Sequence, residues 1–221
     1  KALNANLQVV VAFRMLPKVV WEMPQFGTFN LHASLLPNYR GAAPINWAII
    51  NGETNTGVTT FFRDDKIDTG AMILSSEISI TKNENAGELH DRLMNLGCKT
   101  VVDTLKLIKN GTVTTVVQQE NDDIKTAYKL DKDNCKIDWA KSGTEIHNLI
   151  RGLSPYPVSW CYFNDKDQEW NVKIYEAQYI KEDHVISIGS IITTKKELKV
   201  AVKDGFIQIK SLQMPGKKKM N

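Results

Sequence analysis

Cysteine is scarce in this sequence, and its scarcity argues against two classes of protein. The 221 residues include only Cys98, Cys135 and Cys161, which lie far apart and form no Cys-x-x-Cys pair. A disulfide-stapled secreted domain or a structural zinc site would need paired or clustered ligands. We therefore expect reduced thiols in a cytoplasmic protein of bacterial type, with a mitochondrial source as the alternative, and no metal.

Long apolar runs are also absent, which argues against a membrane span. The longest, such as residues 9–13, have the length of a strand and fall far short of roughly 18 residues. The hydrophobic content of 42% is nevertheless enough for two modest cores or one large one. We expect a globular monomer with no membrane partner.

The sequence lacks an initiating methionine and any recognisable leader. It begins at Lys1 and enters a strand-like apolar run within a few residues. The last residues, Lys-Lys-Met-Asn, also follow no terminating pattern. We expect further residues upstream, including any targeting peptide, and truncation at both ends.

The net charge is small but unevenly distributed along the chain. The formal net charge is +3, and residues 185–221 hold eight lysines against Glu197 and Asp204. Such a basic segment suits a polyanionic partner. A solvated lysine-rich tail explains the same composition.

The first half of the chain alternates between strand and helix patterns. The continuous apolar run Leu7–Phe13 predicts a strand buried on both faces of a parallel sheet. Further strands are expected at 28–32, 58–62 and 72–80, and helices at 44–50 and 86–110. This alternation favours an α/β domain over residues 1–121.

A polar stretch over residues 122–136 reads as a linker, and a different pattern follows it. Ser142 and Glu145 form a capping box ahead of a helix whose apolar face holds Ile146, Leu149, Ile150 and Leu153. Short strands are then expected at 158–163, 172–179, 185–192, 198–202 and 206–212. Residues 137–221 are thus predicted to form a small barrel of the OB type.

Two polar residues stand out in the predicted strand at 28–32. Residues two apart on a strand share a face, so Asn30 and His32 point together while Phe29 and Leu31 point the other way. The carboxyl ends of strands in open α/β sheets are where ligands bind. Satisfying backbone groups at a strand end is the competing explanation for both side chains.

Asp68 lies in an acidic loop between two predicted strands, after Asp64 and Asp65. Its carboxylate suits a proton acceptor. Read alone, it is equally explained as a turn or cap residue.

The ordered set of these residues resembles one family. The segment FNLHASLLPNYRGAAPINWAII at 29–50, followed by GVTTFF and by KIDTGAMI ending at Ile73, is similar to the transferases and hydrolases that use 10-formyltetrahydrofolate. The resemblance implies a Rossmann-like α/β domain, incomplete at its N-terminus, followed by an OB-like barrel. It also implies that Asn30 and His32 stabilise an oxyanion and that Asp68 moves the amine proton.

The same resemblance places the folate. It implies contacts from Ser34, Leu35, Leu36 and Pro37 and from the segment that includes Met15 and Leu16. Arg14, in that segment, suits either the acidic tail of the folate or the protein surface. The family usually has an acid where this chain has Ala71, and we expect this departure to weaken activity at most.

The second half narrows the resemblance to methionyl-tRNA formyltransferases. The segments AYKLDKDNCKIDWAKSGTEIHNLIRGLSPYPVSW at 127–160 and GFIQIKSLQMPGKKKM at 205–220 are similar to their linker and C-terminal domain. The resemblance implies initiator methionyl-tRNA as the partner and 10-formyltetrahydrofolate as the formyl donor. The residues then expected to contact tRNA are Arg40, Lys217, Lys218 and Lys219, although Arg40 equally suits a role in organising its own loop.

Two other hypotheses remain from sequence alone. An enzyme that formylates a nucleotide-linked amino sugar would share the first set of motifs and have no useful affinity for tRNA. An RNA-binding module fused to an inactive scaffold would bind tRNA and transfer no formyl group. The intact set of Asn30, His32 and Asp68 argues against the second of these.

Overall fold

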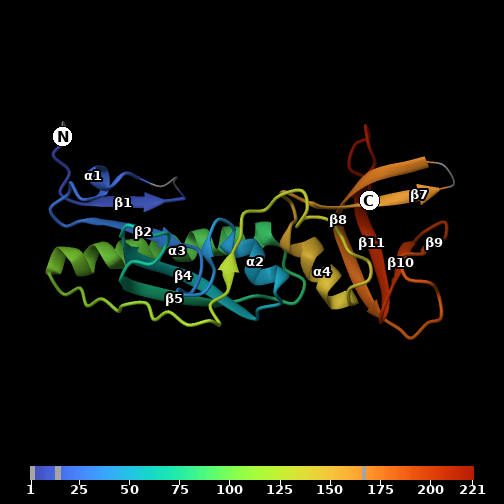
Figure 1. Ribbon diagram of the computed structural model, residues 1–221, viewed down its shortest axis with the longest axis horizontal. Coiled ribbons are helices and arrows are strands. Elements are labelled where there is room, and N and C mark those ends of the chain that lie inside the picture. Colours follow the sequence, from blue (N-terminus) through green and yellow to red (C-terminus); the bar gives the residue numbers. More distant parts are fainter. Residues whose placement is uncertain (1–2, 13–15, 166–167) are drawn as a thin grey trace. The chain divides into compact units, whose positions relative to one another are not determined.

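The computed structural model describes residues 3–12, 16–165 and 168–221 (Figure 1). The chain divides into two compact units. Unit 1 comprises residues 1–45, 54–80 and 89–129, and unit 2 comprises residues 46–53, 81–88 and 130–221. Two short segments of the N-terminal half therefore belong to the unit that the C-terminal half builds.

Unit 1 is built on a four-stranded mixed sheet. Its strands, in the spatial order β1-β2-β4-β5, are β1 (Gln8–Val11), β2 (Thr28–His32), β4 (Asn55–Phe62) and β5 (Met72–Ser79). Strands β1 and β2 run parallel, whereas the other neighbours are antiparallel. A separate parallel pair joins β3 (Arg40–Gly41) to β6 (Thr126–Ala127). The helices of the N-terminal half of the chain are α1 (Lys18–Trp21), α2 (Pro44–Ile50) and α3 (Ala86–Asn110).

Helix α3 lies along one face of this sheet (Figure 1). A Cβ added to Gly97 would lie 2.8 Å from the Leu31 side chain, so the missing side chain lets helix and strand approach closely. Thr104 Oγ1 and Thr60 Oγ1 form a buried hydrogen bond of 2.8 Å across the same interface. Leu31 therefore faces the helix, which leaves Asn30 and His32 for the opposite face of the sheet.

Strand β1 departs from the prediction of a strand buried on both faces. Val10 is buried, but Val9 is 40% exposed and Val11 is 55% exposed. The strand pairs only with β2 among the described residues, so it is an edge strand. An apolar run is buried only where a neighbouring layer covers it. The described part of the chain covers one face of β1 and leaves the other exposed.

Unit 2 contains a curled five-stranded antiparallel sheet in the order β7-β8-β11-β10-β9. Its strands are β7 (Ser159–Asp165), β8 (Gln168–Lys181), β9 (Ile191–Thr193), β10 (Leu198–Val202) and β11 (Gly205–Gln213). Among the described residues the edge strands β7 and β9 are not paired with each other, so the sheet forms a half-barrel and not a closed barrel.

The predicted capping box begins helix α4 (Gly143–Gly152), which packs against this sheet. The Ser142 hydroxyl accepts a hydrogen bond from the Glu145 backbone N–H, and the Glu145 carboxylate accepts one from the Ser142 backbone N–H. These two bonds satisfy donors that a helix start leaves free. Ile146 and Ile150 of the predicted apolar face enter a fully buried cluster with strand residues such as Val172, Ile174 and Ile207.

The strand predicted at 185–192 is wrong over most of its length. Residues 184–190 form an irregular loop, and only Ile191 and Ile192 of the predicted span lie in β9. His184 holds this loop: its Nε2 donates toward the carbonyls of Val202 and Gly205 at 2.8 and 2.9 Å, and its Nδ1 accepts from the Ile186 N–H at 3.1 Å. Side-chain hydrogen bonds thus replace the sheet pairing that the apolar pattern indicated.

Within the described ranges, no helix is both long enough and apolar enough to cross a bilayer.

Candidate functional site

Strand β2 presents the two polar residues that the sequence singled out. Asn30 and His32 are 8% and 6% exposed, on the face of the sheet opposite α3. Their cross-strand partners are Phe61 and Thr59 of β4. Burial in unit 1 therefore holds both side chains in place, as a preorganised site requires.

The two ring nitrogens of His32 have different surroundings. Nε2 lies 2.7 Å from the backbone carbonyl oxygen of Tyr39. Because a carbonyl oxygen can only accept, Nε2 carries the proton in this bond. Nδ1 lies 3.7 Å from Asp68 Oδ2, so it is the nitrogen left to face a ligand and the carboxylate. It can donate a hydrogen bond only when the ring is an imidazolium.

Asp68 is 9% exposed and adopts a left-handed backbone conformation, with φ of 55°. Its Oδ2 accepts a hydrogen bond of 3.0 Å from the backbone N–H of Gly41. Non-glycine residues in this conformation are uncommon and persist where surrounding contacts hold them. The loop thus turns a buried carboxylate toward His32.

The other two acids of this loop have separate partners. Asp64 accepts hydrogen bonds from the Thr69 hydroxyl at 2.8 and 2.9 Å, which closes the loop on itself. Asp65 lies 3.5 Å from the Lys18 ammonium on the surface. Of the three acids, Asp68 is the one paired with His32.

Four buried side-chain polar atoms of unit 1 have no hydrogen-bond partner within the described part of the chain. Thr56 Oγ1 and Arg63 Nε are two of them, and the other two belong to predicted site residues: Oδ1 of Asn30 and Nη2 of Arg40. The rest of the Arg40 guanidinium is engaged: Nε donates to Gln118 at 2.9 Å and Nη1 lies 3.9 Å from Glu120. Unpaired buried polar atoms are costly, and the two in Asn30 and Arg40 suit a polar ligand.

The segment that follows β2 is fixed by hydroxyl groups. Thr59 Oγ1 donates to the Ser34 carbonyl at 2.8 Å and accepts from the Leu36 N–H at 3.2 Å. The Ser34 hydroxyl donates to the Asn38 carbonyl at 2.6 Å, and Leu35 and Pro37 are half-buried. The four residues expected to contact folate thus form one ordered segment at the carboxyl end of β2. Leu16 is half-buried ahead of α1, whereas Met15 and Arg14 lie outside the described residues.

Three groups that join this cluster were not singled out in the sequence. They are the Tyr39 carbonyl, the Gly41 N–H and the Gln118 amide, whose Nε2 donates to the carbonyls of Asp68 and Gly70 at 2.9 and 2.8 Å. A Cβ on Gly41 would lie 2.4 Å from the Ala127 carbonyl oxygen, so this position requires glycine. The glycine itself was therefore the signal in the sequence for a close backbone approach. Nothing in the sequence distinguishes Gln118 from Gln119 beside it.

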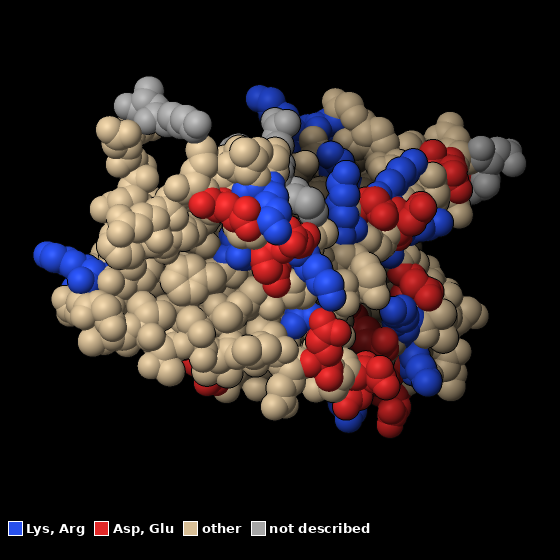
Figure 2. Space-filling view, turned by 60° about the vertical axis from the view of Figure 1, so that its left-hand side comes forward, with Lys and Arg blue, Asp and Glu red and all other residues tan. Residues whose placement is uncertain are grey.

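The lysines near the C-terminus lie in an ordered turn of unit 2. Backbone hydrogen bonds of 2.8 and 2.9 Å join Met220 to Leu212, so residues 214–219 return to the end of β11. Lys217, Lys218 and Lys219 are exposed, and the Lys219 ammonium lies 4.9 Å from the centre of the Tyr175 ring. Figure 2 shows basic and acidic side chains interspersed on the face it presents, so charge is not segregated there.

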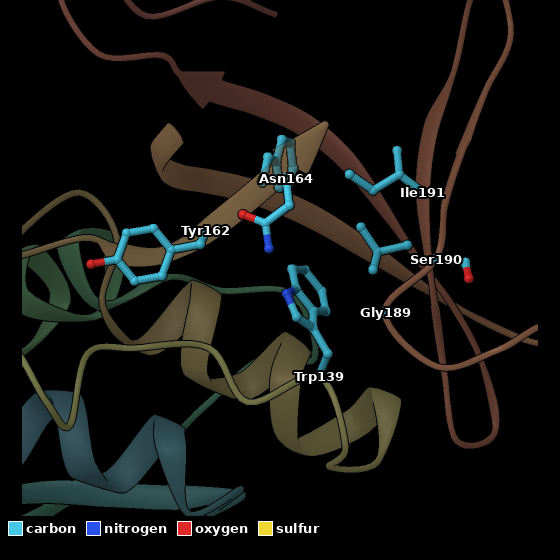
Figure 3. Close-up of a pocket in the computed structure, with 8 residues that line it drawn as sticks. Trp139, Tyr162, Asn164, Gly189, Ser190 and Ile191 are labelled. Atoms are coloured by element: carbon cyan, nitrogen blue, oxygen red, sulfur yellow. The ribbon is translucent and has the colours of Figure 1, made fainter. Parts of the chain in front are cut away.

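A cavity of about 540 Å³ lies on unit 2 (Figure 3). It is lined by Trp139, by strand residues of β7 including Tyr162, and by the loop at residues 189–191. Lys136 lies beside it, with its ammonium 5.2 Å from the centre of the Tyr162 ring. This lining combines aromatic rings with the Asn164 amide and the Ser190 hydroxyl.

The residues that the structure describes contain no group of three or more His, Cys, Asp or Glu side chains placed to hold a metal ion.

Comparison with known proteins gives matches over both units. The formyl transferase profile matches residues 1–105, and the profile of the formyl transferase C-terminal domain matches residues 129–221. A methionyl-tRNA formyltransferase of Flavobacterium johnsoniae is 73% identical over 220 residues, which is 100% of this chain and 70% of that protein. One of Bacteroides thetaiotaomicron is 50% identical over 222 residues, covering 98% of this chain and 69% of that protein.

Solved structures show the same fold at lower identity. HypX from Aquifex aeolicus in complex with tetrahydrofolic acid has a TM-score of 0.73 and 17% identity, covering 97% of this chain and 36% of that chain. An N-formyltransferase from Helicobacter canadensis, in complex with folinic acid and dTDP-3-aminofucose, has a TM-score of 0.65 and 26% identity. It covers 82% of this chain and 64% of that chain.

Proposed function

The chain belongs to the methionyl-tRNA formyltransferase family, and from this membership we propose that Asn30, His32 and Asp68 transfer the formyl group of 10-formyltetrahydrofolate to the α-amine of initiator methionyl-tRNA. The family uses formyl-tetrahydrofolate, and its product, formylmethionyl-tRNA, serves translation initiation. The observation that carries the residue assignment is the meeting of a buried imidazole and a buried carboxylate at 3.7 Å in a formyl transferase unit.

The reaction begins with attack of the methionyl amine on the formyl carbon. The tetrahedral intermediate has a negative oxygen and a positive nitrogen, and both charges need a partner. The Asn30 amide N–H and His32 Nδ1–H are the donors that we assign to the oxygen. Removing one such donor typically raises the barrier by about 3 to 4 kcal/mol.

His32 acts in this scheme as an imidazolium. Its Nε2 proton is committed to the Tyr39 carbonyl at 2.7 Å, so a second proton on Nδ1 is needed for donation to the oxyanion. Asp68, at 3.7 Å, is the carboxylate that stabilises the resulting charge. Its buried position lets the pair act with little competition from water.

Asp68 also takes the proton that the amine loses. The carboxylate accepts it, directly or through one water, and passes it toward the folate nitrogen that leaves. The Gly41 N–H bonded to Oδ2 at 3.0 Å keeps the carboxylate oriented through this exchange. The tetrahydrofolate then leaves with the proton, and the amide nitrogen of the product carries the formyl group.

The folate contacts that we assign are Ser34, Leu35, Leu36 and Pro37, with Leu16 and Met15. The ordered segment after β2 supports this assignment, because its half-buried Leu35 and Pro37 offer an apolar wall beside backbone groups. The Helicobacter canadensis relative was solved with folinic acid, which agrees with a folate-binding site.

We assign the tRNA contacts to Arg40, Lys217, Lys218 and Lys219. The three exposed lysines support this, because ammonium groups bind phosphates, and the guanidinium of Arg40 offers the same chemistry. Unit 2 is proposed to be a variant of the OB barrel, which its five curled strands support. A monomeric cytosolic enzyme completes the proposal.

The test is formyl transfer from 10-formyltetrahydrofolate to charged initiator methionyl-tRNA by the intact gene product. Wild-type activity together with its loss in Asp68→Asn would support both substrate and site. A protein that ignores the tRNA and formylates a dTDP-linked amino sugar would overturn the choice of substrate. Salt-dependent tRNA binding without any formyl transfer would overturn the catalytic role.

A further inference from the structure

We propose that Gln118 is a positioning residue that holds the Asp68 carboxylate in its working orientation. This inference rests on the proposed role of Asp68 and extends it to a residue 50 positions away in the sequence. Gln118 belongs to the irregular segment between α3 and β6, and its side chain is 6% exposed. It does not need to touch substrate in order to act.

Every hydrogen-bonding atom of the Gln118 amide is used within unit 1. Nε2 donates both protons, one to the Asp68 carbonyl at 2.9 Å and one to the Gly70 carbonyl at 2.8 Å. Oε1 accepts from Arg40 Nε at 2.9 Å. Carbonyl oxygens only accept and the guanidinium only donates, so the chemistry of the partners fixes which end of the amide is nitrogen.

These bonds act on the backbone that orients the carboxylate. Asp68 has a φ of 55°, a backbone conformation that residues other than glycine adopt only at some cost in free energy. The two bonds from Gln118 hold the carbonyls on either side of Thr69 and so maintain this turn. Gly70 permits the turn, since a Cβ there would lie 1.6 Å from the Phe62 carbonyl oxygen.

The same amide holds the partner of the carboxylate. Arg40, bonded to Gln118 Oε1, directly precedes Gly41, whose N–H donates to Asp68 Oδ2 at 3.0 Å. One side chain therefore connects the loop that carries the acid to the short strand β3 that carries its donor. Loss of the amide removes hydrogen bonds on both sides of this contact at once, whereas the pairing of β3 with β6 remains.

A positioning role predicts a specific kinetic pattern. If Gln118 acts through Asp68, its loss lowers kcat and leaves the KM values nearly unchanged. The loss also disappears once Asp68 can no longer act, because two residues that act as one unit are not additive. A residue that only stabilises the fold has the same effect whether or not Asp68 is intact.

The experiment is a double-mutant cycle in the intact gene product, measured by steady-state formyl transfer. Gln118→Met keeps the length of the side chain and removes the amide, and Gln118→Glu keeps the acceptor for Arg40 and removes both donated protons. Each is combined with Asp68→Asn. We expect either Gln118 variant to lower kcat by about 10- to 100-fold in the wild-type background and by less than about 2-fold in the Asp68→Asn background.

Three outcomes would overturn the inference: a wild-type kcat in both Gln118 variants, an equal loss in both backgrounds, or a change confined to KM. If Gln118→Met fails to fold, as judged by its thermal transition, the near-isosteric Gln118→Glu decides the question alone. Absence of formyl transfer in the wild-type protein would instead defeat the proposed function, so the two failures are distinguishable.

Discussion

Both units bury polar side chains, including Asn148 and Arg151 in unit 2, but unit 1 brings a buried imidazole together with a buried carboxylate. Unit 1 buries a series of polar residues around its sheet, among them Asn30, His32, Thr59, Asp68 and Gln118. Unit 2 instead has a cluster dominated by buried aliphatic residues between α4 and its sheet, including Ile146, Ile174 and Ile207. Buried polar groups need partners to offset their desolvation, whereas an aliphatic cluster stabilises the fold directly. The first pattern fits a reaction site and the second fits a scaffold that carries a surface.

We expect the largest effect on activity from a substitution of Asp68 in unit 1. Asp68→Asn keeps the size of the side chain and an oxygen that can accept from the Gly41 N–H, but it removes the proton acceptor. Loss of a general base typically lowers the rate by about 10² to 10⁴-fold. Formyl-transfer kinetics would show the loss while the melting temperature stays near that of the wild type. A variant that unfolds would instead make this residue part of the scaffold.

A substitution in the aliphatic cluster of unit 2 should instead lower the free energy of unfolding. Ile174→Ala removes a fully buried side chain from the aliphatic cluster and is expected to cost about 2 to 5 kcal/mol. Cysteine alkylation measures this loss, because Cys161 is buried beside Ile174 and burial raises the pKa of its thiol to about 12. Its alkylation should accelerate, whereas exposed Cys98 reacts at the wild-type rate. An unchanged rate at Cys161 would contradict the role of this cluster.

A smaller change to unit 2 tests its helix start. Ser142→Ala removes the hydroxyl that accepts from the Glu145 N–H and is expected to cost about 1 kcal/mol. Ser142→Asp retains an acceptor and serves as the matched control. Urea denaturation followed by the helical circular dichroism signal would separate the two variants. Equal midpoints for both would show that the capping bond contributes little.

The smallest expected effect is on the pH dependence of unit 2. Burial lowers the pKa of His147 below its ordinary value of 6.5, and the nearby Arg151 charge lowers it further. Below about pH 6.5 the unfolded chain therefore binds a proton more readily than the folded chain, so stability falls as the pH falls. Thermal melts between pH 8 and pH 5 should show this slope. It should be reduced in His147→Gln, and an identical slope in that variant would assign the effect to other groups.

The sequence predicted the regular elements well because their signals are local. Strand β2, helices α2 and α3 and the capping box at Ser142 all lie where the patterns placed them. The misplaced strand at 185–192 and the half-exposed β1 have a common cause. An apolar run does not state whether a partner strand or a covering layer exists, and both depend on residues far away in the chain.

Some groups of the candidate site could be predicted from the sequence, and others could not. Asn30, His32 and Asp68 could be selected from the sequence because a resemblance joined them, and the structure places His32 beside Asp68. The Tyr39 carbonyl and the Gly41 N–H are backbone groups, which a sequence of side chains does not display. Gln118 could not be found at all, because its bonds to Asp68 and Gly70 span about 50 residues of chain.

That long span has a consequence for how the protein is made. Ribosomes synthesise chains from the N-terminus, so residues 30, 32, 68 and 70 leave the exit tunnel well before residue 118. The hydrogen bonds that Gln118 makes to the acid loop therefore form only after α3 has been synthesised and the following segment has reached β5, where Val116 bridges Met72. Under the proposed roles, a nascent chain stalled before this point holds Asn30, His32 and Asp68 without the amide of Gln118. If Gln118 has the proposed role, catalytic competence is acquired late in translation.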